Sequence, residues 1–426
     1  MADPRPFAEL EVVEFGQFIA VPYCGQLLAD GGAHVIKVES LEGDPVRRLA
    51  PLAAGESRLF ACRNRGKHSL PLDLKHPAAA RIIDALVTSA DVVLTNLRPG
   101  FAATLALDAA TLVARHPRLI VGNVSGFGSR GADAALPAMD LVVQARSGLM
   151  AASGRTREGI PVAADPPLAD YMCAMMLAFG IASALFRRAL TGRGGEVDVS
   201  LLMAALVVQN NAMVRVHGVD GQVHAASLER LTRLRQGGAP FAEQLAVTPQ
   251  FRTPAMTSVY YRTYATRDAA IAVACVSPGL QRTLMRVVGV TDEAHEEPPA
   301  DRAAEARHYA ALQTRVEAVV ASRTTTEWKA IFDAHGIPAA AVKIPLELLD
   351  DEQALTNGML HDLEHPALGR VRVVSTPVRI DGDGFTPAPA ARAFGSEARE
   401  ILCALGFSPA EVDGFLAADV TRERFT

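Results

Sequence analysis

Residues 12–39 read VVEFGQFIAVPYCGQLLADGGAHVIKVE, and this stretch decides the fold. Two apolar runs in it, Val12–Phe15 and His34–Glu39, are typical of buried strands. The segment between them is predicted to be a helix, because Pro22 suits a first helical turn and Gly31 suits a helix end. A strand, a helix and a second strand in this order predict a βαβ unit with parallel strands.

The same alternation continues along the chain. Residues 91–97 and 118–124 are further buried-strand patterns, and each follows a helical stretch, Pro77–Ser89 and Asp108–Arg115. The order predicts an α/β fold with a parallel sheet and right-handed crossovers. Ligands of such sheets bind outside the carboxyl ends of the strands. The loops expected at that edge are residues 14–19, 39–44, 96–100 and 125–128.

Two glycine-rich signatures are missing from these loops. The first one, Gly16–Ala20, is not a G-x-G-x-x-G sequence, and G-x-x-x-x-G-K-[ST] does not occur in the chain. Dinucleotide and P-loop chemistry are therefore disfavoured. The glycines of Thr191–Gly195 are predicted to end a helix rather than to bind phosphate.

Composition limits the class of protein. A chain of 426 residues predicts two or three domains at ~100 to 200 residues each. A net charge of -5 gives no basis for nucleic-acid or membrane-surface binding. The N-terminus lacks the pattern of a secretory signal, and the apolar run 171–186 is shorter than the ~20 residues that span a bilayer. We therefore expect a cytoplasmic protein without a membrane segment.

Cysteine and histidine spacing predicts neither disulfides nor a metal site. The five cysteines include no C-x-x-C pair, and the eleven histidines include no H-E-x-x-H. Reduced, buried thiols are expected instead.

A second, smaller module is predicted after a change of composition near Val207. Residues 259–288 have the pattern of a hairpin followed by a helix, and two further helices are predicted at Arg307–Ala321 and Thr325–His335. The acidic run 292–301 is interpreted as a solvated loop. The predicted boundaries are 1–205 for the N-terminal part of a large domain, 206–230 for a linker, 231–330 for a small α+β domain and 331–426 for the return to the large domain.

Asp170 is the only charged residue between Asp165 and Arg187, and the apolar run 171–186 follows it directly. A carboxylate in that position is either a helix cap or a reactive group in a low-dielectric wall. The segment alone favours the cap.

The chain resembles the family III CoA-transferases over nearly its whole length. Each resembling stretch is common by itself, and the order and spacing of the set are specific. The stretches are Val12–Phe15, Leu27–Asp30, Gly32–Glu39, Gly43–Pro45, Asn64–Lys75, Ala90–Gly100, Ser125–Gly128, Asp140–Leu149, Pro167–Asp170, Thr191–Ser200 and Gly336–Val342.

The resemblance implies a Rossmann-like large domain built from both chain ends, a smaller α+β domain, and an interlocked-ring homodimer. It implies a CoA-transferase that moves CoA from an acyl-CoA donor to a carboxylic acid acceptor. Asp170 would be the nucleophile, forming first a mixed anhydride and then an aspartyl-CoA thioester. Coenzyme A would be part of the substrate, with no permanently bound cofactor, and free amides at the helix start would stabilise the oxyanion.

The resemblance also assigns CoA contacts. They are Gln17, Phe18, Ile19, Ala20, Leu72, Lys75, Asn96, Leu97 and Arg98. Four arginines are further candidates for the CoA phosphates, each with an ordinary surface position as the alternative: Arg47, Arg48, Arg63 and Arg65.

Met139 and Asp140 are expected in the substrate pocket. Similar 2-methylacyl-CoA racemases, which need a base on each face of the substrate, have a histidine directly before this aspartate. Met139 occupies that position here, which weakens the racemase hypothesis. Met139 is interpreted as part of the acyl pocket or as a core methionine, and Asp140 as a residue that orients its neighbours or caps the following helix. A non-catalytic CoA-binding protein is the third hypothesis.

Overall fold

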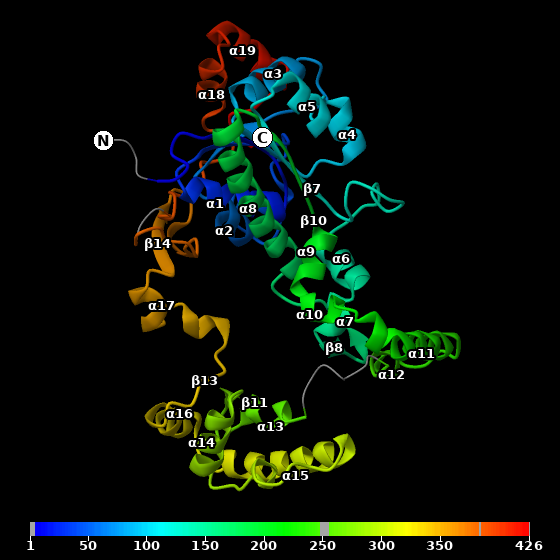
Figure 1. Cartoon of the computed structure of the whole chain (residues 1–426). Coiled ribbons are helices and arrows are strands. Elements are labelled where there is room, and N and C mark those ends of the chain that lie inside the picture. The colour runs from blue at the N-terminus through cyan, green and yellow to red at the C-terminus, as the bar shows by residue number, and fades with distance from the viewer. Residues whose placement is uncertain (1–4, 248–254, 383–384, 426) are drawn as a thin grey trace. The chain divides into compact units, whose positions relative to one another are not determined.

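The computed structural model describes residues 5–247, 255–382 and 385–425. The chain forms two compact units, of which the first takes residues from both chain ends (Figure 1). The first unit comprises Met1–His217, Pro240–Ala242 and Glu352–Thr426, and the second comprises Gly218–Ala239 and Glu243–Asp351.

The first unit is built on a six-stranded sheet in the order β10-β7-β6-β1-β2-β5, in which every neighbouring pair is parallel. The predicted α/β fold with a parallel sheet is therefore confirmed. The strands are β1 (Glu11–Phe15), β2 (His34–Glu39), β5 (Lys67–Pro71), β6 (Val92–Thr95), β7 (Ile120–Ser125) and β10 (Gly195–Ser200). The sequence did not identify β5, whose first residues are polar. Lys67 is nevertheless buried there, because it pairs with Glu14 of β1.

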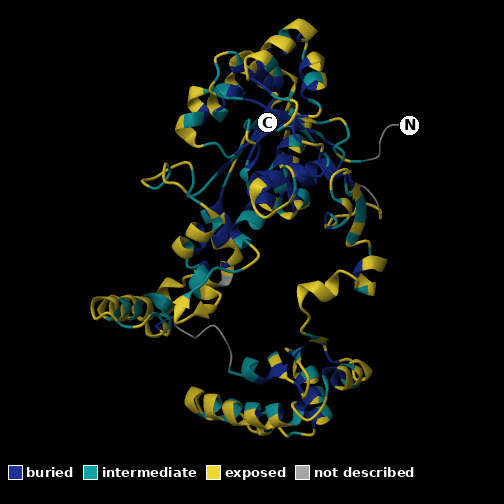
Figure 2. Cartoon of the chain, turned by 180° about the vertical axis from the view of Figure 1, so that it is seen from behind, coloured by how far each residue is buried: buried dark blue, intermediate teal, exposed yellow. Residues whose placement is uncertain are grey.

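Helices cover both faces of this sheet. Successive side chains of a strand point to opposite faces, so Val12 packs in one core and Val13 in the other. The first face is covered by α1 (Ala20–Asp30), α8 (Leu168–Thr191) and α9 (Leu201–Val208). The second face is covered by α3 (Ala79–Ser89), α5 (Ala109–Arg115) and, from the C-terminal part of the chain, α18 (Ala398–Ala404) and α19 (Pro409–Ala417). Figure 2 shows the buried residues gathered along the sheet and the inner sides of these helices.

Shorter elements connect the sheet to its helices. Those before α8 are η1 (Pro45–Arg48), β3 (Pro51–Ala53), β4 (Glu56–Ser57), α2 (Arg58–Asn64), α4 (Pro99–Thr104), α6 (Asp140–Ser147), α7 (Leu149–Ala152), β8 (Thr156–Arg157) and β9 (Ile160–Pro161). Those after α9 are α10 (Asn210–Met213), α17 (Glu352–Thr356), β14 (Leu360–His365) and β15 (Gly369–Val374). Among the described residues, β15 pairs only with β14.

The second unit has the predicted hairpin and helices. Its antiparallel sheet contains β11 (Tyr261–Ala265), β12 (Ala270–Ala274) and β13 (Ala339–Ala341). The accompanying helices are α13 (Thr257–Tyr260), α14 (Pro278–Val288), η2 (Glu293–His295), α15 (Arg302–Val320), α16 (Thr325–Ala334) and η3 (Pro345–Leu348). The segment predicted as a linker, 206–230, overlaps with a 20-residue helix, α11 (His217–Gln236). A short helix, α12 (Phe241–Leu245), follows α11.

Helix α8 is longer than its sequence suggested. It has 24 residues, and by length and composition it could cross a membrane, so the expectation that the segment is too short was wrong. One side of the helix is buried against the sheet. At Gly180 it approaches β10 so closely that an added Cβ would lie 2.4 Å from Cγ1 of Val197. This packing is that of a core helix, while Phe179 and Phe186 on its other side are exposed.

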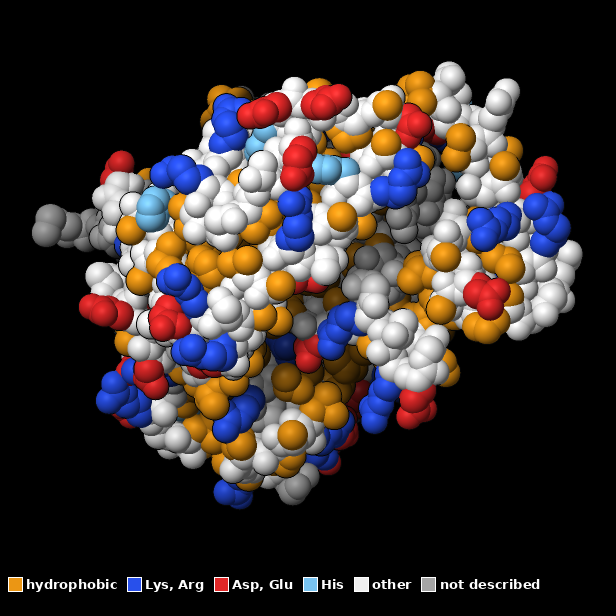
Figure 3. Space-filling view, turned by 90° about the horizontal axis from the view of Figure 1, so that it is seen from below, with side chains coloured by type: hydrophobic (Ala, Val, Ile, Leu, Met, Phe, Trp, Pro, Cys, Tyr) orange, Lys and Arg blue, Asp and Glu red, His pale blue; other side chains and the backbone are white. Residues whose placement is uncertain are grey.

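Surface charge follows the composition. On the face shown in Figure 3, lysine and arginine side chains are interspersed with aspartate and glutamate and form no continuous basic area. This distribution agrees with the net charge of -5 and offers no surface suited to a polyanion on that face.

Candidate active site

The loops that follow β1, β6 and β7 meet at a cavity of about 700 Å³ at the carboxyl edge of the sheet. Residues of α6, α8 and α9 complete its wall. The cavity-lining residues that the sequence had singled out are Gln17, Phe18, Ile19, Ala20, Lys75, Asn96, Leu97, Arg98, Met139, Asp140 and Asp170.

Asp170 is the third residue of α8, and it is not the cap of that helix. The cap is Asp140, whose Oδ1 accepts hydrogen bonds from the backbone N–H groups of Ala169 (3.0 Å) and Asp170 (3.2 Å). The capping interpretation of Asp170 was therefore wrong, because a carboxylate 30 residues earlier satisfies the first amides of the helix. The side chain of Asp170 remains available to the cavity.

Asp140 is itself held by Gln144, a fully buried residue one turn further along α6. Gln144 Nε2 donates to Asp140 Oδ2 at 2.5 Å, and Gln144 Oε1 accepts from the N–H of Ala164 at 2.9 Å. These bonds tie α6 to the segment before α8. Asp140 Oδ1 occupies the amides of Ala169 and Asp170, so these two amides of the helix start are not free to stabilise an oxyanion.

The surroundings of Asp170 favour its protonated form. Burial and, to a smaller extent, the nearby carboxylate of Asp140 raise its pKa, Arg63 opposes both, and the resulting pKa is about 7. Arg63 is buried, and its guanidinium donates from Nε to the hydroxyl of Tyr171 (3.2 Å) and from Nη1 to the carbonyl of Leu59 (3.2 Å). A carboxylate with this pKa is more basic than an ordinary aspartate, and its charge changes near neutral pH.

The first loop is held in an unusual conformation. Phe18 has φ = 68°, a left-handed value that a residue with a side chain rarely adopts. The side chain of Asn96 binds both backbone groups of Gln17, the residue before Phe18. Its Oδ1 accepts from the N–H of Gln17 (3.1 Å), and its Nδ2 donates to the carbonyl of Gln17 (2.9 Å). Asp44 Oδ1 lies 3.5 Å from the N–H of Phe18. The side chain of Asn96, expected to contact CoA, therefore supports the loop.

A buried ionic network lies beneath this loop. Lys37 Nζ donates to the carbonyl of Gly16 (2.7 Å) and pairs with Glu14 (3.0 Å) and Asp44 (2.9 Å). Burial opposes the charge of Lys37, but Glu14 and Asp44 raise its pKa above the ordinary value. Lys67 pairs with the second oxygen of Glu14 at 2.7 Å, and burial lowers the pKa of Lys67 to about 8. No local pattern predicts this network, because it joins strands and loops that are distant along the chain.

Leu72 does not line the cavity. Its side chain is fully buried in the core between the sheet and the helices of the second face. A contact of this residue with CoA, as the resemblance implies, would have to come from its backbone.

The phosphate candidates separate into two groups. Arg47 is buried, pairs with Glu39 (2.7 Å) and Glu56 (3.0 Å), and lies over the ring of Phe60. Arg65 is buried and pairs with Asp30, also buried, at 2.5 Å. Arg47 and Arg65 are thus neither surface residues nor free for a phosphate. Arg48 is exposed and donates to the carbonyl of Glu42, and Arg63 lies near Asp170.

Lys75 and Arg98 are exposed cations that line the cavity. Neither side chain pairs with another residue in the described part of the chain. They are the cavity's available partners for phosphate groups.

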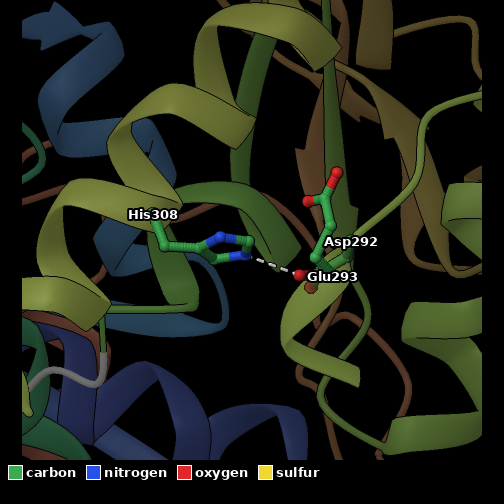
Figure 4. A group of neighbouring side chains, drawn as sticks. All are labelled: Asp292, Glu293 and His308. Atoms are coloured by element: carbon green, nitrogen blue, oxygen red, sulfur yellow. Dashed lines mark hydrogen bonds and ion pairs between the residues drawn. The ribbon is translucent and has the colours of Figure 1, made fainter. Parts of the chain in front are cut away.

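A second polar cluster lies in the smaller unit (Figure 4). Asp292, Glu293 and His308 bring ligand atoms within 4.8 Å of one another, a spacing that could hold a metal ion. Their oxygens already have partners: Asp292 accepts from Tyr260 and lies 2.6 Å from His308 Nε2, and Glu293 pairs with Arg315. We assign these contacts to packing of the unit. Asp292 is buried, so the interpretation of 292–301 as a solvated loop was wrong at its first residue.

Comparison with known proteins identifies the family. The model of CoA-transferase family III matches residues 7–396. Cinnamoyl-CoA:phenyllactate CoA-transferase of Clostridium sporogenes is 28% identical over 418 residues, covering 96% of this chain and 95% of that protein. Succinyl-CoA–D-citramalate CoA-transferase of Chloroflexus aurantiacus is 28% identical over 396 residues, covering 89% and 91%. A crystal structure of a CaiB/BaiF family protein from Brucella suis superposes with a TM-score of 0.72 at 26% identity, covering 94% and 99%. The chain therefore belongs to CoA-transferase family III, enzymes that transfer CoA between an acyl-CoA and a carboxylate.

Proposed function

We propose that this enzyme moves CoA from an acyl-CoA donor to a carboxylic acid acceptor through covalent intermediates on Asp170. One observation carries the proposal: Asp170 lines the cavity from the start of α8, and its pKa is raised to about 7. Its backbone amide is occupied by Asp140, while its own carboxylate faces the space where a thioester would bind. This is the arrangement expected of a nucleophile rather than of a structural cap.

The proposed reaction balances as a series of acyl transfers. An oxygen of Asp170 attacks the donor thioester carbonyl, the C–S bond breaks, and CoA leaves as a thiolate, giving a mixed anhydride. The thiolate then attacks the aspartyl carbonyl, breaks its C–O bond to the acyl group, and releases the donor acid. An oxygen of the acceptor carboxylate then attacks the aspartyl thioester carbonyl, the C–S bond breaks, and CoA leaves as a thiolate, giving a second mixed anhydride. The thiolate attacks the acceptor's acyl carbon, the C–O bond to Asp170 breaks, and the new acyl-CoA departs with Asp170 regenerated. Each step passes through an oxyanion, which hydrogen-bond donors stabilise more strongly where water is excluded.

The other two hypotheses are less favoured. A 2-methylacyl-CoA racemase needs a second base, and the residue before Asp140 is Met139. A racemase would introduce solvent deuterium at C2 of the substrate, whereas CoA transfer would not. A non-catalytic protein would bind CoA esters without turnover. The relatives that support transfer are named for different acids, so similarity alone does not choose the substrate.

The direct test is a covalent adduct on Asp170. Trypsin would cut after Arg157 and Arg187, leaving Asp170 in the peptide 158–187. Brief incubation with acyl-CoA donors, acid quench and mass spectrometry should show the mass of an acyl or CoA group on this peptide. An adduct that forms on another peptide, with none on 158–187, would contradict the proposal.

Asp170→Asn should abolish both the adduct and CoA exchange. Because the folded protein raises the pKa of Asp170, ionisation of this group disfavours folding as pH rises from ~4 to about 7. The amide variant should therefore be at least as stable as the wild type at pH 8, measured by thermal unfolding. Near-normal exchange in this variant would reject Asp170 as the nucleophile.

We also propose that the enzyme works as an interlocked homodimer. Support comes from apolar side chains exposed on two neighbouring helices, α8 and α9. Exposed apolar side chains on neighbouring helices favour burial against another protein surface. The exposed side chains are Met175, Met176, Phe179, Phe186 and Leu190 of α8 and Met203, Leu206, Val207 and Val208 of α9.

A further inference from the structure

The two sides of the active-site cavity differ in charge. Lys75 follows β5, and Arg98 follows β6, so both free cations belong to the part of the sheet that runs from β6 to β5. Residues 134–142 follow β7, and Leu201 follows β10, at the other end of the strand order. Neighbouring strands lie ~4.8 Å apart, so the order of strands separates these groups in space. Asp170 adjoins the second side through its backbone N–H, which donates to Asp140 Oδ1 at 3.2 Å.

The wall on this second side is apolar. Leu136, Met139 and Val142 line the cavity, and these residues are 54%, 49% and 47% exposed, respectively. Such side chains lose contact with water when an apolar ligand covers them, which favours binding. The remaining apolar lining on this side consists of Ala134, Ala135, Pro137, Ala138 and Leu201.

The charges on the same side are negative. Asp140 and Asp170 both line the cavity. Two cations lie outside the cavity lining: Arg63, near Asp170, donates to the hydroxyl of Tyr171 and the carbonyl of Leu59, and Arg146 pairs with Asp133 at 3.2 Å. A second carboxylate on the acyl group would therefore meet the carboxylate of Asp140 and, in the ionised form that attacks the thioester, that of Asp170. No cation is among the described residues that line this side.

We infer that the acyl side of the cavity accepts monocarboxylic acyl groups with an apolar body and selects against acyl groups that carry a second carboxylate. The inference rests on the proposed transfer at Asp170 and names the substrate class of that site. CoA would extend from Asp170 toward Lys75 and Arg98, which supply the cations for its phosphates. The acyl group would occupy the wall formed by residues 134–142 and Leu201.

The experiment compares two CoA esters of equal chain length, butanoyl-CoA and succinyl-CoA, with a shared acceptor acid. The wild type should use butanoyl-CoA with a kcat/KM at least tenfold higher. Met139→Lys, which places a cation in the apolar wall, should reduce that ratio at least tenfold by improving the use of succinyl-CoA. Val374→Lys adds the same charge at an exposed apolar residue outside the cavity and should leave the ratio unchanged.

Direct titration of the wild-type protein with each ester, without acceptor, separates this inference from the proposed function. Tighter binding of butanoyl-CoA with no exchange for any acid pair would support the apolar site and reject the transfer proposal. Exchange that proceeds equally well or better with succinyl-CoA would overturn the inference and leave transfer at Asp170 intact. Equal binding of the two esters in a protein without exchange would overturn the inference as well.

Discussion

Asp140 and Asp170 are two carboxylates in one cavity with different tasks. The oxygens of Asp140 accept hydrogen bonds from the amides of α8 and from Gln144, whereas the carboxylate of Asp170 accepts none from the residues that the structure describes. The pair explains how a helix start can hold a reactive carboxylate. Asp140, which lies outside α8, caps this helix, so the carboxylate of Asp170 does not have to bind the first amides of the helix.

Removing the charge of Asp140 should change the pH dependence of the reaction. In the proposed reaction the ionised form of Asp170 is the nucleophile, so kcat/KM in the wild type should rise with pH through about 7. Asp140→Asn keeps an oxygen for the two amides but removes a negative charge that raises the pKa of Asp170. The rise should then move to lower pH by about one pH unit.

The measurement is kcat/KM between pH 5 and 9, with Asp133→Asn as a control because Asp133 pairs with Arg146 on the surface. An unmoved profile in Asp140→Asn would contradict the electrostatic role. Asp140→Ala removes the cap as well and should cost about 1 kcal/mol of folding free energy, measured by urea unfolding.

At the scale of elements, the first loop depends on a residue that follows a different strand. Asn96, after β6, binds both backbone groups of Gln17, and the next residue, Phe18, has a left-handed φ. A strained loop of this kind persists only where its surroundings hold it. The ionic network of Lys37, Glu14 and Asp44 provides the rest of that support.

Asn96→Ala should release the loop without unfolding the sheet. We expect faster amide hydrogen exchange in residues 16–20 and a KM for acyl-CoA raised by about tenfold, since ~1.4 kcal/mol corresponds to a factor of ten. Asn96→Asp keeps the acceptor for the Gln17 amide and loses the donor, so its effect should be intermediate. If KM rises in Asn96→Ala while exchange in this loop stays slow, Asn96 contacts the substrate directly and does not act through the loop.

At the scale of the whole molecule, the exposed apolar side of α8 predicts self-association. Phe179 and Phe186 are seven residues apart, so they share one side of the helix, and each is 69% exposed. The double change Phe179→Glu and Phe186→Glu should convert a dimer into monomers in sedimentation experiments. Leu52→Glu, on the short strand β3, is the matched control. A wild-type protein that sediments as a monomer would reject the dimer.

The sequence by itself determined the parallel α/β fold, most of its strands and helices, and Asp170 as the residue to examine. Alternating apolar runs and helix boundaries are local signals. They predict the observed elements because strands and helices bury residues with the same periodicities in the folded protein. The resemblance along the chain identified the family, which the family match from residue 7 to 396 confirms.

Only the tertiary structure decided which side chains are free to act. Asp140 caps a helix that begins 28 residues later, Arg47 and Arg65 are neutralised by buried carboxylates, and Leu72 turns into the core. Each of these outcomes depends on partners far away in the sequence, because the residues that lie close in space determine whether a side chain is buried, caps a helix or forms an ion pair. The residue types were visible in the chain, but their pairing required the fold.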